Sequence, residues 1–206
     1  MATTTFNGPV RSENGFQMVS KNATTGAITV TSGDKMAVEA TASAGIEGTA
    51  AVYVTQVTRL KSDVSTNVNI VKTSIMIDLT GLKDGGTAGD IIGKDGSGVA
   101  FIGQVTAANQ GTVFGVTMTC VETPAGGSAD IDLFSATEGT GVNDTAIGDL
   151  TETQIINSGS LSAGSLVAGG DIAADQFLYL VSQGTGDATY TAGRLMIEIL
   201  GFDAAS

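Results

Sequence analysis

From residue 51 onward, apolar and polar side chains alternate with a period of two, which is the pattern of half-buried β-strands. The clearest runs lie at 52–55, 75–80, 113–118, 130–133, 177–181 and 195–200. Segments rich in Gly and Asp separate these runs, at 83–86, 94–98, 124–127 and 184–187, and such segments favour turns. About eight strands joined by loops predict an all-β fold, an antiparallel β-sandwich that is jelly-roll-like.

The alternation also predicts the core. The side chains that we expect to point inward are Ile131 and Leu133, Phe177 and Tyr179, and Leu195, Ile197 and Ile199. The strands at 176–182 and 194–200 carry apolar residues on both faces, so each is either central in the sandwich or covered by a neighbouring subunit. Apolar surface in excess of one core favours an oligomer.

The run at 113–121 holds the only cysteine. We expect Phe114, Val116 and Met118 to share one face of a strand, opposite Val113 and Thr117. Continued alternation places Cys120 on the face of Val116 and Met118. A single cysteine forms no intrachain disulfide, and the chain has no His to activate a thiol, so we interpret Cys120 as a buried free thiol.

The first 50 residues differ from the rest because they contain few large apolar side chains. Asn7-Gly8 and Asn14-Gly15 are dipeptides that favour hairpin turns. We therefore expect residues 1–50 to be an extended N-terminal arm with a few short strands and residues 51–206 to be the β-sandwich body. For 144–170 two interpretations remain open: strands, with 154–156 as one candidate, or a long loop.

Charge is distributed very unevenly along the chain. The formal net charge is −12, and no Lys, Arg or His occurs between Lys94 and Arg194, a stretch that holds eleven Asp and Glu residues. A surface that binds nucleic acid or an anionic membrane needs clustered cations, so we expect neither partner. The amino terminus has no basic region followed by an apolar one, so we expect no signal peptide, and no segment is apolar enough for a membrane helix.

Two groups of carboxylates are candidates for chemistry. Asp84, Asp90 and Asp95 lie in a Gly-rich region, and oxygen ligands on loops suit Ca²⁺, but Asp-Gly pairs are ordinary turn chemistry, which is the interpretation that we favour. Asp130 and Asp132 point to the same face of a strand, where one carboxylate raises the pKa of the other. We interpret that face as the solvent side, opposite Ile131 and Leu133.

No motif for catalysis occurs in the sequence. The nucleophile elbow Gly-x-Ser-x-Gly and the phosphate loop Gly-x-x-x-x-Gly-Lys-Ser/Thr are both absent, and the sequons at Asn22 and Asn143 lack a secretory signal. We therefore predict that the protein is not an enzyme, with no catalytic residue, no metal ligand and no cofactor.

Four segments of the sequence resemble a known class of proteins. They are MATTTFNGPVRS at 1–12, ADIDLFSAT at 129–137, QFLYLV at 176–181 and YTAGRLMIEI at 190–199. These segments are similar to small structural proteins of tailed bacteriophages, particularly marine ones. The resemblance implies a virion protein, often encoded near the major capsid protein.

The resemblance and the charge together lead to one leading hypothesis. A protein with a net charge of −12 suits the outside of a DNA-filled shell rather than its genome side. We expect a capsid decoration (cement) protein, made in the host cytoplasm, that binds the major capsid protein on the outer surface of the virion as a homotrimer. The alternatives are a tail, neck or fibre component, a carbohydrate-binding or adhesive β module, and an enzyme that uses carboxylates alone.

Overall fold

The computed structural model describes residues 19–21, 28–30, 43, 45–46, 57–60, 68–96 and 98–204. The chain divides into two units, residues 1–35 and 36–206. In the first unit, β1 (Val19–Lys21) and β2 (Ile28–Val30) form an antiparallel pair in which Val19 lies opposite Val30. The predicted turns at Asn7-Gly8 and Asn14-Gly15, and the predicted strand at 52–55, lie outside the described residues.

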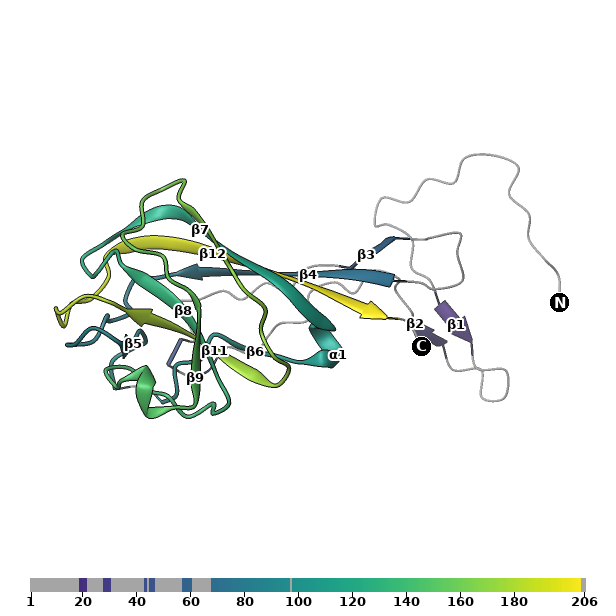
Figure 1. Cartoon of the computed structure of the whole chain (residues 1–206), viewed down its shortest axis with the longest axis horizontal. Coiled ribbons are helices and arrows are strands. Elements are labelled where there is room, and N and C mark those ends of the chain that lie inside the picture. The colour runs from purple at the N-terminus through teal and green to yellow at the C-terminus, as the bar shows by residue number, and fades with distance from the viewer. Residues whose placement is uncertain are drawn as a thin grey trace. The chain divides into compact units, whose positions relative to one another are not determined.

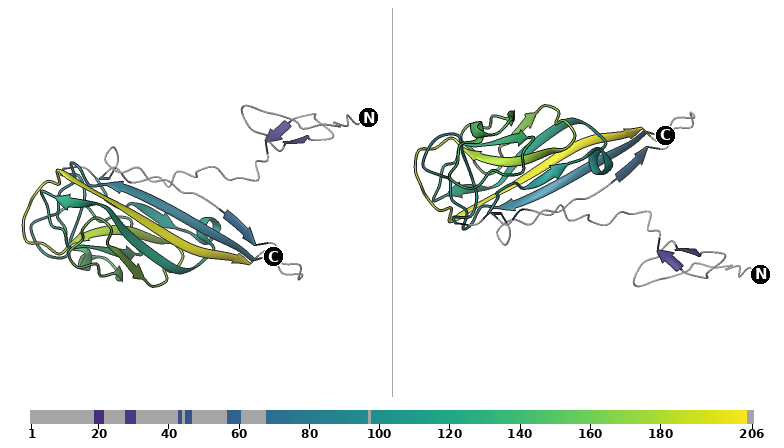
Figure 2. Two further views of the ribbon diagram at one scale, coloured as in Figure 1. Left: turned by 90° about the horizontal axis from the view of Figure 1, so that it is seen from above. Right: turned by 90° about the horizontal axis from the view of Figure 1, so that it is seen from below.

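The second unit contains a large antiparallel sheet (Figures 1 and 2). Its strand order is β10 (Leu166–Gly169), β7 (Thr112–Ala125), β12 (Ala192–Ala204), β4 (Val68–Asp78) and β3 (Val57–Leu60). The central strand β12 pairs with β4 without interruption, from Arg194 opposite Asp78 to Ala204 opposite Val68. The last two predicted apolar runs therefore lie in the middle of sheets, β12 in this one and β11 in the next.

A second antiparallel sheet packs against the first. Its strand order is β5 (Asp90–Ile91), β11 (Gln176–Ser182), β8 (Ile131–Ala136) and β9 (Glu152–Ile156), and β6 (Gly103–Val105) also pairs with β11. The prediction of an all-β protein with an antiparallel sandwich is thus confirmed. The narrower jelly-roll connectivity and the extended N-terminal arm remain predictions.

The core contains the side chains that the alternation predicts, on both faces of the second sheet. Ile131, Leu133, Leu195, Ile197 and Ile199 are buried in it, and so is Tyr179. The register places Tyr179 opposite Phe134 and Leu180 opposite Leu133, so Tyr179 and Phe177 lie on the face of the second sheet opposite Leu133. Phe177 is partly buried and lies 5.0 Å from Phe101, ring centre to ring centre. All six residues of β8 are buried, on both faces of the strand. The second sheet is therefore covered on both faces at β8, whereas residues 152–154 of β9 are exposed.

Loops cover the second sheet on the side away from the large sheet. The hydroxyl of Tyr179 donates a hydrogen bond to the carbonyl oxygen of Glu138 (2.8 Å) and accepts one from the amide of Gly141 (3.2 Å). A Cβ at Gly141 would collide with Ile91 and Tyr179, so only glycine allows this loop to lie so close. Burial raises the pKa of Tyr179, as expected for a phenol enclosed by its own loop.

A short segment before β3 belongs to the same layer. The amide and hydroxyl of Ser43 both donate to the carbonyl oxygen of Phe101, and the amide of Gly45 donates to that of Val99 (2.7 Å). Ile46 is completely buried in the core. Ser43, Gly45 and Ile46 lie within the stretch that the sequence assigns to the arm, yet they pack into the sandwich. The boundary at residue 50 remains a prediction.

The alternation fails at the start of β7, where the predicted position of Phe114 is wrong. Val113 is buried and Phe114 is 51% exposed, because β7 changes register against β12: Leu200 lies opposite Gly115, but Gly201 lies opposite Val113. The extra residue is a β-bulge, which reverses the faces of all residues before it. Farther along, Val116, Met118 and Cys120 are buried as predicted.

Short elements that the sequence left open complete the fold. Residues 144–170 contain the 3₁₀ turn η1 (Ile147–Asp149), β9 and β10, so strands are the correct interpretation of this stretch. The single helical turn α1 (Ala107–Gln110) has no counterpart in the predicted elements. Thr106 caps it by accepting from the Asn109 amide at 3.2 Å, and the Gln110 side chain accepts from the Thr106 amide at 2.8 Å.

Candidate functional site

The three aspartates considered as calcium ligands have separate roles in the structure. The carboxylate of Asp84 is buried and accepts hydrogen bonds from the amides of Ser128 (2.8 Å) and Ala188 (2.7 Å). Asp90 is also buried and accepts from the amide of Thr87 at 2.7 Å. Among the described residues no group of three or more acidic, His or Cys side chains is placed to hold a metal ion.

Asp95, the third of these residues, lies on the surface in a small ion-pair network. The ammonium group of Lys83 lies 3.1 Å from a carboxylate oxygen of Asp187 and 3.2 Å from one of Asp95. Hydrogen bonds from Lys83 to these two carboxylates, that of Asp187 first, raise the pKa of the lysine. This network joins the loops that follow β4, β5 and β11. Its geometry indicates loop fastening rather than ligand binding.

The interpretation of Asp132 as a solvent-facing residue is wrong. Asp132 is 1% exposed, and its carboxylate accepts from the Gln154 side chain and the Ser158 amide, both at 2.8 Å. The alternation predicts one buried and one solvent-exposed face, but both faces of β8 are covered in the structure. Asp130 is half-buried, and its pKa is raised by desolvation and then by the charge of Asp132.

Cys120 is a buried free cysteine, as predicted. Its Sγ lies 3.2 Å from the carbonyl oxygen of Glu122, and desolvation raises the pKa of the thiol. A raised pKa disfavours the thiolate, which is the nucleophilic form of cysteine. Cys120 is therefore a packing residue.

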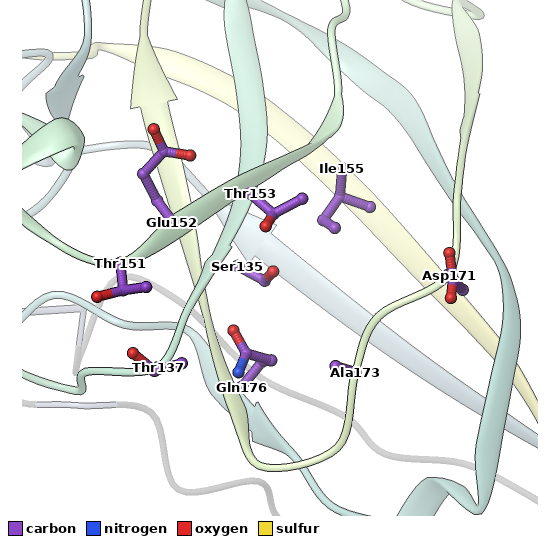
Figure 3. A pocket seen from close by; sticks show the side chains of 9 residues that line it. All are labelled: Ser135, Thr137, Thr151, Glu152, Thr153, Ile155, Asp171, Ala173 and Gln176. Carbon is purple, nitrogen blue, oxygen red and sulfur yellow. The ribbon is translucent and has the colours of Figure 1, made fainter.

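A pocket opens at one end of the sandwich and is lined mainly by polar side chains (Figure 3). It measures about 330 Å³, and its lining is Ser135, Thr137, Thr151, Glu152, Thr153, Ile155, Asp171, Ala173 and Gln176. Strand register explains the concentration of hydroxyl groups, because Ser135 lies directly opposite Thr153 across β8 and β9. Such a lining offers hydrogen bonds to a hydroxylated ligand, but it lacks an aromatic ring on which a sugar stacks.

The outer face of the large sheet, which points away from the second sheet, is the other candidate site. Phe114, Val121 and Leu166, all in β7 and β10, are 51%, 48% and 63% exposed and are the exposed large hydrophobic residues of the described chain. Met196 points to this face, since its neighbours Leu195 and Ile197 are fully buried. The sequence does not predict this patch. Alternation places Phe114 on the same face as Val116 and Met118, and the bulge that exposes Phe114 cannot be recognised from the alternation.

Charge divides the two sides of the sandwich. The second sheet and its loops carry most of the acidic groups. Those exposed or half-exposed there are Asp95, Asp130, Glu138, Asp144, Asp149, Glu152, Asp171, Asp175 and Asp187, against two cations, Lys83 and Lys94, in the loops beside β5. On the large sheet, by contrast, Lys72 pairs with Glu198, and Arg194 lies 3.2 Å from Asp78 and 3.6 Å from Glu122. The molecule therefore has one strongly acidic side and one nearly neutral side.

Comparison with known proteins found no matching family model, no similar curated protein and no similar solved structure. No helix within the described residues is long and apolar enough to span a membrane.

Proposed function

We propose that this chain is a structural virion protein, a capsid decoration protein that binds the outer surface of the shell and stabilises it. The observation that supports this proposal most directly is the division of charge between the two sides of the sandwich. A side with nine exposed or half-exposed acidic groups and only two cations, Lys83 and Lys94, is repelled by packaged DNA, so the protein belongs outside the shell. The sequence resemblance to phage structural proteins points to the same place.

In this role the major capsid protein is the partner, and the decoration protein is a homotrimer. A rigid sandwich suits a component that spans neighbouring capsid subunits, because its three layers of strands and loops resist deformation. The arm adds contacts between subunits by pairing with an exposed strand edge of a neighbour. Removing the arm is then expected to weaken attachment to the shell, and equal binding by the shortened protein would contradict this role for the arm.

Copy number in the particle tests the proposal. Quantitative mass spectrometry of purified particles gives the ratio of this chain to the major capsid protein. A ratio near one is expected for a lattice-wide decoration protein. A ratio of a few per cent assigns the chain to a tail, neck or fibre instead, and absence from particles removes the virion role altogether.

A second candidate function is that of a carbohydrate-binding or adhesive β module, and the polar pocket is the observation that favours it. Three threonines, Ser135 and Gln176 supply donors and acceptors that match sugar hydroxyls. A glycan array probed with the purified protein tests this function. Binding that Ser135→Ala and Thr153→Ala abolish supports it, whereas an array without hits rejects it.

A further inference from the structure

The outer face of the large sheet is unusual for a protein with so large a net charge. Its apolar side chains form two groups: Phe114 and Phe202, whose rings lie 6.3 Å apart, and Leu166 with Met196 nearer the other end. Leu166 lies opposite Thr119 on β7, and Thr119 lies opposite Met196 on β12, so the second group crosses three strands. Apolar side chains grouped on adjacent strands of one exposed face mark an interaction site more reliably than isolated residues do.

The charges on this face nearly cancel one another. Two basic residues, Lys72 and Arg194, face three acidic residues, Asp78, Glu122 and Glu198, which leaves −1 on a protein of −12. Each cation already has a carboxylate partner on its own sheet. A strongly charged partner therefore gains no electrostatic attraction from this face. A partner surface that is apolar with balanced charges, such as the same face of another copy, is complementary to it.

The acidic side of the sandwich restricts how copies of the chain can meet. Contact through the second sheet and its loops would bring nine exposed or half-exposed acidic groups of each copy together with only two cations, Lys83 and Lys94. Contact through the outer face of the large sheet places the large sheets of the copies between their acidic layers, which separates these layers by more than one sheet spacing of about 10 Å. That separation exceeds the Debye length of about 8 Å at physiological salt, so the repulsion is screened.

We infer that the outer face of the large sheet is the surface through which copies of this chain associate. The inference deepens the proposed homotrimer, in which three such faces surround the symmetry axis and the acidic sides point outward. The association does not depend on the virion, because the interacting partners are copies of the same chain and are all present in the purified protein.

The test is the mass of the full-length protein in solution, measured by sedimentation velocity at micromolar concentration. The wild-type chain is expected to be an oligomer. Phe114→Glu and Leu166→Glu, combined in one variant, place two further negative charges per subunit in the contact and are expected to give a monomer. Thr140→Glu adds a charge in an exposed loop on the acidic side and is expected to leave the oligomer intact.

Circular dichroism and a thermal melt of each variant establish that it is folded, and the single variants replace the combined one if that protein unfolds. A monomeric wild-type protein overturns the inference. An oligomer that persists in the combined variant, or in both single variants where these replace it, overturns the inference as well. A wild-type monomer whose face variant no longer binds shells also overturns it and assigns the face to the capsid protein. Copy number in particles is measured separately, so failure of the virion proposal leaves this result unaffected.

Discussion

At the scale of single residues, the buried carboxylates of this protein fasten loops through backbone amides. Asp84 joins two segments far away in the sequence, because it accepts from the amides of Ser128 and Ala188. Asp132 does the same for the segment after β9 through the amide of Ser158. Hydrogen bonds to a charged acceptor are about twice as strong as those between neutral groups. These carboxylates are therefore structural, and for Asp84 this agrees with the turn chemistry that the sequence favours over ion binding.

The role of Asp84 leads to a measurable effect on stability. Asp84→Asn replaces one acceptor oxygen with an amide donor that faces a backbone N–H, so we expect the free energy of unfolding to fall by about 2 kcal/mol. Urea denaturation measures this change. Asp95→Asn, at an exposed position in the same region, is the control and is expected to have a much smaller effect. The structural role would be contradicted if added Ca²⁺ raised the free energy of unfolding of the wild-type protein but not that of Asp84→Asn.

Asp130 is expected to weaken the native state at neutral pH. Desolvation and the charge of Asp132 raise its pKa, so the folded protein holds this proton more tightly than the unfolded chain does. The ionised form consequently costs stability above the folded pKa, and the cost disappears below the unfolded value of about 3.9. Asp130→Asn is expected to raise the melting temperature at pH 7 and to leave it unchanged near pH 3. Asp171→Asn, at an exposed site, serves as the control, and equal gains in both variants would refute the assignment.

At the scale of elements, the bulged pairing of β7 with β12 fits the helical turn α1 against the large sheet. Gly201 of β12 lies against the backbone carbonyl of Gln110, the last residue of α1, at a distance that leaves no space for a Cβ. The Gln110 side chain is buried and donates to the hydroxyl of Thr73 on β4 at 3.4 Å. Glycine at position 201 is thus required by the close approach of two backbones.

Two strand glycines give a matched test of this contact. Gly201→Ala forces α1 away from the sheet, and overpacking of this kind costs about 1–3 kcal/mol. Gly115→Ala, on the neighbouring strand, meets no atom within 4 Å and is expected to be neutral or slightly stabilising. The measurement is the midpoint of urea denaturation for both variants. Similar losses in the two proteins would show that general strand propensity, and not the contact with Gln110, explains the effect.

The comparison of sequence with structure also belongs at this scale. Period-two alternation predicted β4, β8, β11 and β12 because each strand buries most of at least one face among its described residues. It failed at Phe114, where the bulge adds one residue, and at Asp132, where loops far away in the sequence cover the second face. Both failures arise from tertiary contacts that a single strand does not encode. The polar pocket likewise depends on register between β8 and β9, so no local pattern indicates it.

At the scale of the whole molecule, the second sheet lies between the large sheet and a layer of loops. Ser43 and Gly45 contribute backbone hydrogen bonds to that layer, and Ile46 is completely buried in the hydrophobic core. The unit to which they belong begins at residue 36, whereas β1 and β2 belong to the other unit. The position of a truncation therefore decides whether the sandwich loses part of its core.

Two truncated proteins test this prediction. A chain beginning at Met36 keeps Ile46. Its free energy of unfolding is expected to lie within about 1 kcal/mol of that of the full-length protein, since changes away from the core have small effects. A chain beginning at Ala51 loses Ile46 together with the hydrogen bonds of Ser43 and Gly45. Removing a large aliphatic side chain from a core costs about 2–5 kcal/mol, so this protein is expected to be markedly less stable. Ile46→Ala in the full-length chain separates the loss of the side chain from the loss of the segment. Equal stability of the two truncated proteins would mean that residues 43–46 add nothing to the folded sandwich, and a boundary at residue 50 would then describe its folding unit correctly.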